Sequence, residues 1–128
     1  MACERIEVSI TANGSGDGTG FANPTIAGGY LQAIRYVPDG SLPYATGVDF
    51  TITGETSGIA ILTVTNAGTA ALDFFPRAAT QTIANAAALY AAGGTAVNDR
   101  IPVGERVKIV VAQAGANNVG KFHVFVTS

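Results

Sequence analysis

Charged residues are scarce in this sequence, at 12% of the chain, about half of the roughly 25% that is usual in soluble domains. Hydrophobic residues make up 48%, and a chain with this balance buries a core instead of staying disordered. The net charge of -2 offers no basic surface, so we expect neither nucleic acid nor membrane as a partner. Because few charges remain to cover a monomer, we expect apolar surface to be buried against another subunit.

Cysteine, histidine and tryptophan are also nearly absent, with one, one and none in the chain. Cys3 has no second cysteine for an internal disulfide or a thiolate metal cluster, so a free thiol is expected. No apolar run approaches the roughly 18 residues that a transmembrane helix needs. The first residues lead directly into charge, without the apolar segment of a signal peptide, and we expect synthesis in the cytoplasm.

Apolar and polar residues alternate with a period of two along most of the chain, which is typical of half-buried β-strands. The strands predicted from this alternation are 4–10, 30–37, 48–53, 59–65, 72–75, 105–113 and 119–126. About seven or eight strands with turn residues between them predict an all-β domain, a β-sandwich or jelly-roll-like barrel. The whole chain, 1–128, is expected to form this single domain. Residues 1–25 are either an N-terminal arm or a strand followed by a glycine-rich loop.

The turns between strands predict how some of them pair. We expect 48–53 to form a hairpin with 59–65, and 105–113 to form one with 119–126. Residues 13–20 have glycine at every second position and are expected to form a loop. The side chains expected to face the core are Ile6, Val8, Ile10, Val48, Phe50, Ile52, Val107, Ile109, Val111, Phe122, Val124 and Val126.

Residues 78–94 lack a strand pattern. Their alanines favour a helix over 78–92, and Gly93 and Gly94 would end it. Only about two or three turns fit, and isolated helices that short are marginal. We therefore expect a long excursion, with a short helix or none, that lies over the sheet or reaches a neighbouring molecule.

The sequence offers little catalytic chemistry. Residues 115–121 match the spacing of a phosphate-binding loop, but Phe122 stands where a serine or threonine is needed. The chain there connects two predicted strands instead of entering a helix, so a turn is the better interpretation. His123 has no second histidine for a zinc site, and no nucleophile sequence G-x-S-x-G exists. We expect no enzymatic activity, no metal and no cofactor.

Two further kinds of site stay open at this stage. The acids Asp17, Asp39, Asp49 and Asp99 stand near turns, where short carboxylates are common. A carboxylate pair for glycoside hydrolysis is not excluded, because such pairing is spatial. Tyrosines would form a carbohydrate-binding platform if several of them shared an exposed face.

Several segments resemble a family of small virion proteins of tailed phages and prophages, whose genes lie beside the major capsid gene. The segments are AIRYV (33–37), YATGVDFTITG (44–54), GIAILTV (58–64), FPRAAT (75–80), LYAAGGTAV (89–97), RIPVGERVK (100–108) and GKFHV (120–124). They stand in the order that the family has, and the similarity covers roughly residues 30–128. None of them carries a catalytic signature.

The resemblance implies a head decoration, or cement, protein that binds the outside of an assembled capsid shell. Its partners would be the major capsid protein and further copies of itself. Similar proteins have β-sandwich or jelly-roll folds and sit on symmetry axes as trimers or dimers, and we favour a homotrimer. The implied location is the surface of a phage head, after synthesis in the host cytoplasm.

Contacts with the shell or with other subunits are expected from the loop 13–20 and from the excursion 78–94. The candidate contact residues are Asn13, Asp17, Arg77, Leu89, Tyr90 and Arg100. Pairing within the chain is an equal alternative for the two arginines. The alternative function is a tail- or fibre-associated module that binds a receptor or carbohydrate. An exposed patch of Tyr30, Tyr36 and Tyr44 would favour it.

Overall fold

The computed structural model describes residues 2–26 and 28–128. Sheet A contains β1 (Cys3–Thr11), β11 (Val119–Thr127), β3 (Gly29–Pro38) and β6 (Leu72–Phe74) in that order, and β9 (Ile101–Val103) also pairs with β3. Sheet B contains β2 (Gly18–Ala22), β10 (Val107–Ala112), β4 (Asp49–Gly54) and β5 (Ala60–Val64). A separate ladder joins β7 (Ala78–Ala79) to β8 (Asn98–Asp99). The predicted all-β class and the sandwich-like architecture are confirmed.

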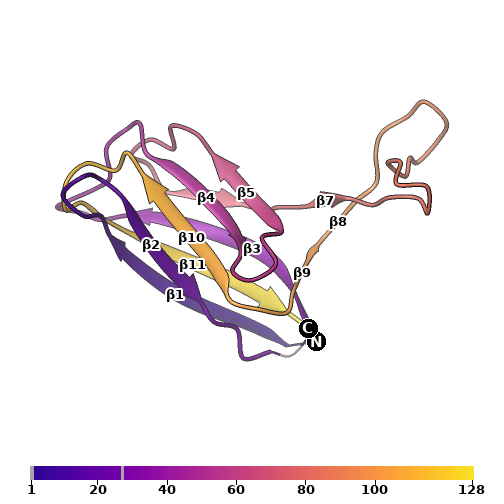
Figure 1. Cartoon of the computed structure of the whole chain (residues 1–128), viewed down its shortest axis with the longest axis horizontal. Coiled ribbons are helices and arrows are strands. Elements are labelled where there is room, and N and C mark those ends of the chain that lie inside the picture. The colour runs from indigo at the N-terminus through magenta and orange to yellow at the C-terminus, as the bar shows by residue number, and fades with distance from the viewer. Residues whose placement is uncertain (1, 27) are drawn as a thin grey trace.

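The two larger sheets pack face to face, and a narrow arm projects from one end of them (Figure 1). The chain crosses between the sheets repeatedly, so strands that are neighbours in sequence often lie in different sheets. β1 begins and β11 ends at the end of the sandwich from which the arm leaves (Figure 1), and the Ser128 amide donates to the Ala2 carbonyl at 3.0 Å. In the described part of the chain no helix has the length and hydropathy to cross a membrane.

One predicted hairpin is confirmed and the other is wrong. β4 pairs with β5 in antiparallel register, with an irregularity between Ile52 and Thr53. β10 and β11 do not pair, because β10 lies between β2 and β4 while β11 lies between β1 and β3. The connection between them has left-handed backbone at Gln113, Gly115 and Asn117, with φ of 58°, 82° and 61°. These residues turn the chain from one sheet to the other, a role that turn residues in sequence do not distinguish from a hairpin.

The N-terminal segment belongs to the sandwich, so its arm alternative does not hold for the described residues. β1 pairs with β11 along its whole length, and the predicted loop 13–20 is shorter than expected because Gly18 already begins β2. A side chain on Gly20 would come within 2.7 Å of the side chains of Ile10 and Val8. Glycine is therefore needed there for β2 to lie close against β1, a reason that a loop assignment from composition misses.

The predicted core faces are confirmed. All of the side chains expected to face inward are buried, except Ile6, which is partly buried at the edge of the core. The centre holds four aromatic rings, those of Tyr36, Tyr44, Phe50 and Phe122, each with 1% exposure or less. Phe50 lies 4.8 Å from Tyr36 and 4.9 Å from Phe122 between ring centres. Such offset and edge-on contacts add to the apolar burial that holds the sheets together.

Tyr44 joins the loop before β4 to β1. Its hydroxyl donates a 2.5 Å hydrogen bond to the Ile10 carbonyl, and its ring stacks on that of Tyr36 with centres 5.8 Å apart. The Tyr36 hydroxyl is buried without a partner among the described residues. Gly120 lies under both rings, where a side chain would come within 2.3 Å of Tyr44. The aromatic core therefore depends on a glycine in β11.

Candidate functional site

An edge of sheet A is interrupted by residues 75–100, which we call the arm. β6 pairs with β3 at Ile34–Tyr36, and β9 pairs with the same strand at Gly29–Leu31, both antiparallel. The two short strands therefore lie one after the other along a single edge of β3. The chain leaves this edge after Phe74 and returns at Ile101, and between these points it extends away from the sandwich (Figure 1). The arm is an insertion into an edge strand.

Arg77 fastens the outgoing side of the arm. Gln32 lies on β3 in the gap between the residues that pair with β6 and those that pair with β9. On the other edge of β3, the register with β11 shifts at the same point. The Arg77 Nη1 atom donates to the Gln32 carbonyl at 3.2 Å and to the Pro76 carbonyl at 2.8 Å. The guanidinium thus supplies a donor to β3 in the gap that β6 and β9 leave on this edge.

Arg100 fastens the returning side. Its Nη1 atom donates to Oγ1 of Thr127 at 3.0 Å, and its guanidinium lies 4.8 Å from the centre of the Tyr30 ring. The Arg100 amide also donates to Asp99 at 2.7 Å. Both arginines predicted as contacts are therefore engaged within the chain, where they hold the arm's root against β3 and β11.

The body of the arm is built from three short extended segments. The amide of Thr80 donates to the Val97 carbonyl, that of Val97 to Ala88, and that of Ala88 back to Thr80, at 2.7–2.8 Å. Turns with left-handed backbone at Asn85 (φ 63°) and Gly93 (φ 71°) connect the segments. The helix considered for 78–92 does not form, because these turns reverse the chain before helical hydrogen bonds can accumulate. The predicted excursion is therefore present, and it is extended and without a helix.

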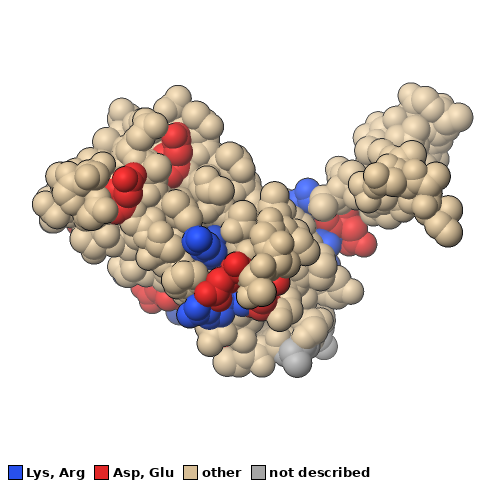
Figure 2. All heavy atoms as spheres, viewed as in Figure 1, with Lys and Arg blue, Asp and Glu red and all other residues tan. Residues whose placement is uncertain are grey.

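The surface of the arm is uncharged and carries several large apolar side chains. No charged residue occurs between Arg77 and Asp99, and Figure 2 shows charge near the arm's root but none beyond it. Ile83 is fully exposed, and Tyr90 and Phe75 are 76% and 64% exposed. Leu89, at 43%, adds to this set. Several large apolar side chains exposed on one uncharged segment are a usual mark of an interaction site.

The loop between β1 and β2, which contains Asn13 and Asp17, lies at the end of the sandwich opposite the arm (Figure 1). Oδ1 of Asn13 accepts hydrogen bonds from the amides of Ser15, at 2.8 Å, and Asp17, at 3.1 Å. This side chain fixes the β1–β2 loop as a tight turn. The structure therefore groups Arg77, Leu89, Tyr90 and Arg100 in or beside the arm and leaves Asn13 and Asp17 at a separate end.

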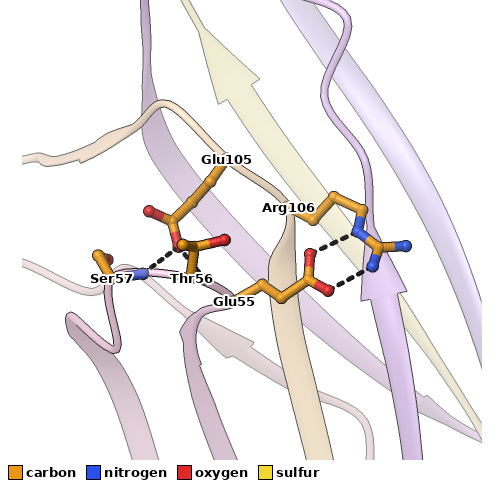
Figure 3. Close-up of polar contacts among 5 residues, drawn as sticks. All are labelled: Glu55, Thr56, Ser57, Glu105 and Arg106. Carbon is orange, nitrogen blue, oxygen red and sulfur yellow. Dashed lines mark hydrogen bonds and ion pairs between the residues drawn. The ribbon is translucent and has the colours of Figure 1, made fainter.

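A polar cluster joins the β4–β5 loop to the start of β10 (Figure 3). Arg106 binds both carboxylate oxygens of Glu55, with Nε at 2.5 Å from Oε2. Glu105 accepts from the amides of Thr56 and Ser57 at 2.6 and 2.9 Å. The ion pair lowers the pKa of Glu55, and the Ser57 amide is the main cause of the lowered pKa of Glu105. A general acid needs a raised pKa, so this cluster of carboxylates has a structural character.

His123 and the tyrosines do not form the sites considered for them. His123 points outward from sheet A, with its Nδ1 atom 2.8 Å from Nη1 of Arg5. No group of three or more potential metal ligands was found in the parts of the chain that are described. Tyr36 and Tyr44 lie in the core, and only Tyr30, 40% exposed, reaches the surface. The exposed tyrosine patch that would favour carbohydrate binding is therefore not formed by these three residues.

Two features of the arm region were missed by sequence reasoning. Ile83 and Phe75 are the arm's other large exposed apolar side chains, and neither was predicted as a contact residue. The signal for Phe75 was its place before Pro76, where a strand must end or lie at an edge. For Ile83 the signal was a single large apolar residue among small ones in an uncharged segment.

The comparisons with known proteins do not assign a family. No protein-family model matches the chain, and no curated protein matches it. A crystal structure of FLHE aligns over 100% of both chains with 8% sequence identity and a TM-score of 0.48. A likeness this weak supports no inference about function.

Proposed function

We propose that this protein is a non-enzymatic structural protein of a virion, a decoration protein that binds the outside of an assembled phage head and stabilises it. The observation that carries the proposal is the arm, an uncharged apolar projection that its own domain leaves uncovered. The resemblance of residues 30–128 to small virion proteins supports the same function. The proposed partners are the major capsid protein and further copies of this chain, with a homotrimer favoured.

In a single molecule, the arm gains little stability from its own contacts. Its hydrogen bonds join short segments with little buried side-chain area, and two-stranded ladders of this size are marginally stable in water. Large apolar side chains such as Ile83 and Tyr90 gain free energy when a partner removes them from water, by roughly 25 cal/mol for each Å². An arm of this composition is therefore stabilised by assembly.

The molecule offers contacts at both of its ends, which suits a protein that bridges neighbours. The arm lies at one end, and the β1–β2 loop with Asn13 and Asp17 lies at the other (Figure 1). A decoration protein holds many identical sites on a shell, so modest contacts at each end add up through multivalency. We infer that the loop end and the arm end contact different molecules in the assembled head.

Co-sedimentation tests this function. The purified chain is mixed with empty heads, with isolated tails and with a bacterial surface polysaccharide, and bound protein is measured after pelleting. Binding to heads that saturates at a fixed ratio to the major capsid protein is expected. Binding to tails or polysaccharide, with none to heads, would overturn the proposal in favour of a receptor- or carbohydrate-binding module. A chain that pellets with none of them would also contradict it.

The heads must have vacant sites for a decoration protein. They are therefore taken from a phage that encodes a close relative of this chain, after the gene for that relative has been deleted. Heads that already carry their native decoration protein serve as the control, because their sites are occupied. Bound protein should drop to background on these heads.

A further inference from the structure

The outer face of sheet A is divided into a charged half and an apolar half. The charged half contains the Glu7–Lys121 ion pair, at 2.9 Å, and the contact of Arg5 with His123. The apolar half lies toward the arm's root and consists of Phe125 and its neighbours. Phe125 faces Ala33 across the ladder between β11 and β3. An apolar side chain on the outward face of an otherwise polar strand suggests that something covers it.

A shallow depression of about 340 Å³ occupies this apolar half. Its lining residues are Cys3, Gln32, Ala33, Ile34, Arg35, Asp73, Phe75 and Phe125. The two charged members, Arg35 and Asp73, form an ion pair with each other at 2.5 Å. The depression is therefore lined mainly by uncharged side chains and by one ion pair, and Phe75 makes it continuous with the root of the arm.

The arm of the same chain cannot fill this depression. The arm extends away from the sandwich (Figure 1), and the depression is lined at the arm's root by Phe75. The β7–β8 ladder and the Arg100–Thr127 hydrogen bond hold the root of the arm in this direction. An apolar projection and an apolar depression of balanced charge are thus present in one chain but can meet only between two chains.

We propose that the arm of one copy docks on this depression of a second copy, with Ile83 and Tyr90 as the inserted side chains. The match in polarity carries the assignment: an arm without charge fits a depression lined mainly by uncharged side chains with one ion pair, Arg35–Asp73. Docking on the charged half of the same face would cover Arg5, Glu7 and Lys121 instead. Contacts of this kind repeat around a closed ring or are exchanged between two copies. The inference rests on the proposed function in one respect, the arm's role in assembly.

Light scattering of the complete chain, without a fusion tag because the termini lie near the depression, gives the first test. A mass that is a multiple of the 12.9 kDa chain is expected at micromolar concentration. A monomer at every concentration would overturn the docking of copies. It would leave head binding untouched, so failure here is distinct from failure of the decoration function.

Two substitutions then test the two surfaces. Ile83→Ser with Tyr90→Ser removes the anchors from an arm where both are exposed, so the fold is unaffected. Ala33→Glu places a longer, charged side chain in the depression. Each change is expected to weaken self-association by about tenfold or more, as truncation of buried anchors does. Thr63→Glu, which adds the same charge on an exposed site of sheet B, is the matched control and should leave the mass unchanged.

Mixing the two variants separates docking from a general loss of association. The Ala33→Glu chain keeps an intact arm, and the Ile83→Ser/Tyr90→Ser chain keeps an intact depression. Together they can form one native contact that neither forms alone, so the mixture should show a heterodimer. Monomers in the mixture, or an oligomer that survives either substitution, would overturn the proposal.

Discussion

Nη1 of Arg100 donates a 3.0 Å hydrogen bond to Oγ1 of Thr127. This bond ties the returning side of the arm to the last strand of sheet A. Thr127 is 4% exposed and is the buried polar residue of the described chain. The Arg100 guanidinium also lies over the Tyr30 ring of β3. Arg100 therefore holds the returning side of the arm against β3 and β11, as Arg77 holds the outgoing side against β3.

Arg100→Ala is expected to lower the free energy of unfolding by about 1–2 kcal/mol, because it leaves the Thr127 hydroxyl buried without its donor. Chemical denaturation of the variant and the parent measures this loss. Arg5→Ala is the control, since Arg5 is exposed on the same sheet, and its effect should stay within about 0.5 kcal/mol. Equal losses in both variants would show that the Arg100 contact does not anchor the arm.

Replacing tyrosine by phenylalanine is expected to affect the stability of the fold differently at the two stacked positions, Tyr44 and Tyr36. Tyr44→Phe removes a hydrogen bond to the Ile10 carbonyl and leaves a buried acceptor, at a cost of about 1–3 kcal/mol. Tyr36→Phe removes a hydroxyl that has no partner and is expected to be neutral or stabilising. Burial raises the pKa of Tyr36 to about 12, in agreement with an unsolvated hydroxyl. A larger loss for Tyr36→Phe than for Tyr44→Phe would contradict this description of the core.

Gly120→Ala is expected to destabilise the domain by about 1–3 kcal/mol, as overpacking of a filled core does. The added methyl group would lie 2.3 Å from Cε2 of Tyr44, so the aromatic cluster must shift. Gly40→Ala, where nothing lies within 4 Å, is the matched control. Thermal unfolding followed by near-ultraviolet circular dichroism reports both stability and the packing of the rings. An unchanged melting temperature for Gly120→Ala would be incompatible with the packing described.

The sequence predicted the strands of the sandwich better than their pairing. Alternation identified which side chains of β10 and β11 are buried, because burial follows a local period of two. It did not identify their partners, since a turn at 113–118 serves a hairpin and a crossing between sheets equally well. The left-handed residues Gln113 and Asn117 are no stronger as sequence signals than those of an ordinary turn.

The arm was predicted in part. The lack of a strand pattern over 78–94 indicated an excursion that lies over the sheet or reaches a neighbour, and the structure has an arm there that extends away from the sandwich. The insertion into an edge strand was not predictable, because it depends on the register of β6 and β9 on β3. The same long-range pairing places Arg77 beside the Gln32 carbonyl. Local sequence patterns therefore could not predict that this arginine anchors the arm.

Acidification is expected to destabilise the fold below about pH 4.5. The pKa of Glu105 is lowered from its ordinary value of 4.5, first by the Ser57 amide, and Arg106 lowers that of Glu55. Groups whose pKa is lower in the folded state stabilise it above the unfolded value, and this contribution is lost as the pH falls through the folded value. Melting temperatures should therefore be nearly constant from pH 7 to pH 5 and fall below that.

Glu105→Gln tests the origin of this pH dependence. The variant keeps the shape of the side chain but cannot titrate, so its melting temperature should fall less between pH 5 and pH 3. Part of the fall should remain, because Glu4, Glu7 and Asp39 also have lowered pKa values. An identical pH profile in the variant and the parent would remove Glu105 from this explanation.

Amide hydrogen exchange of the arm tests its role in assembly most directly. The amides of Thr80, Ala88 and Val97 form the arm's ring of hydrogen bonds, and those of β11 serve as the internal standard. In dilute monomer the arm amides should exchange much faster than those of β11, and they should become protected in the oligomer or on heads. Arm amides as protected as β11 in the monomer, or unprotected in every assembled state, would show that the arm is not an assembly element.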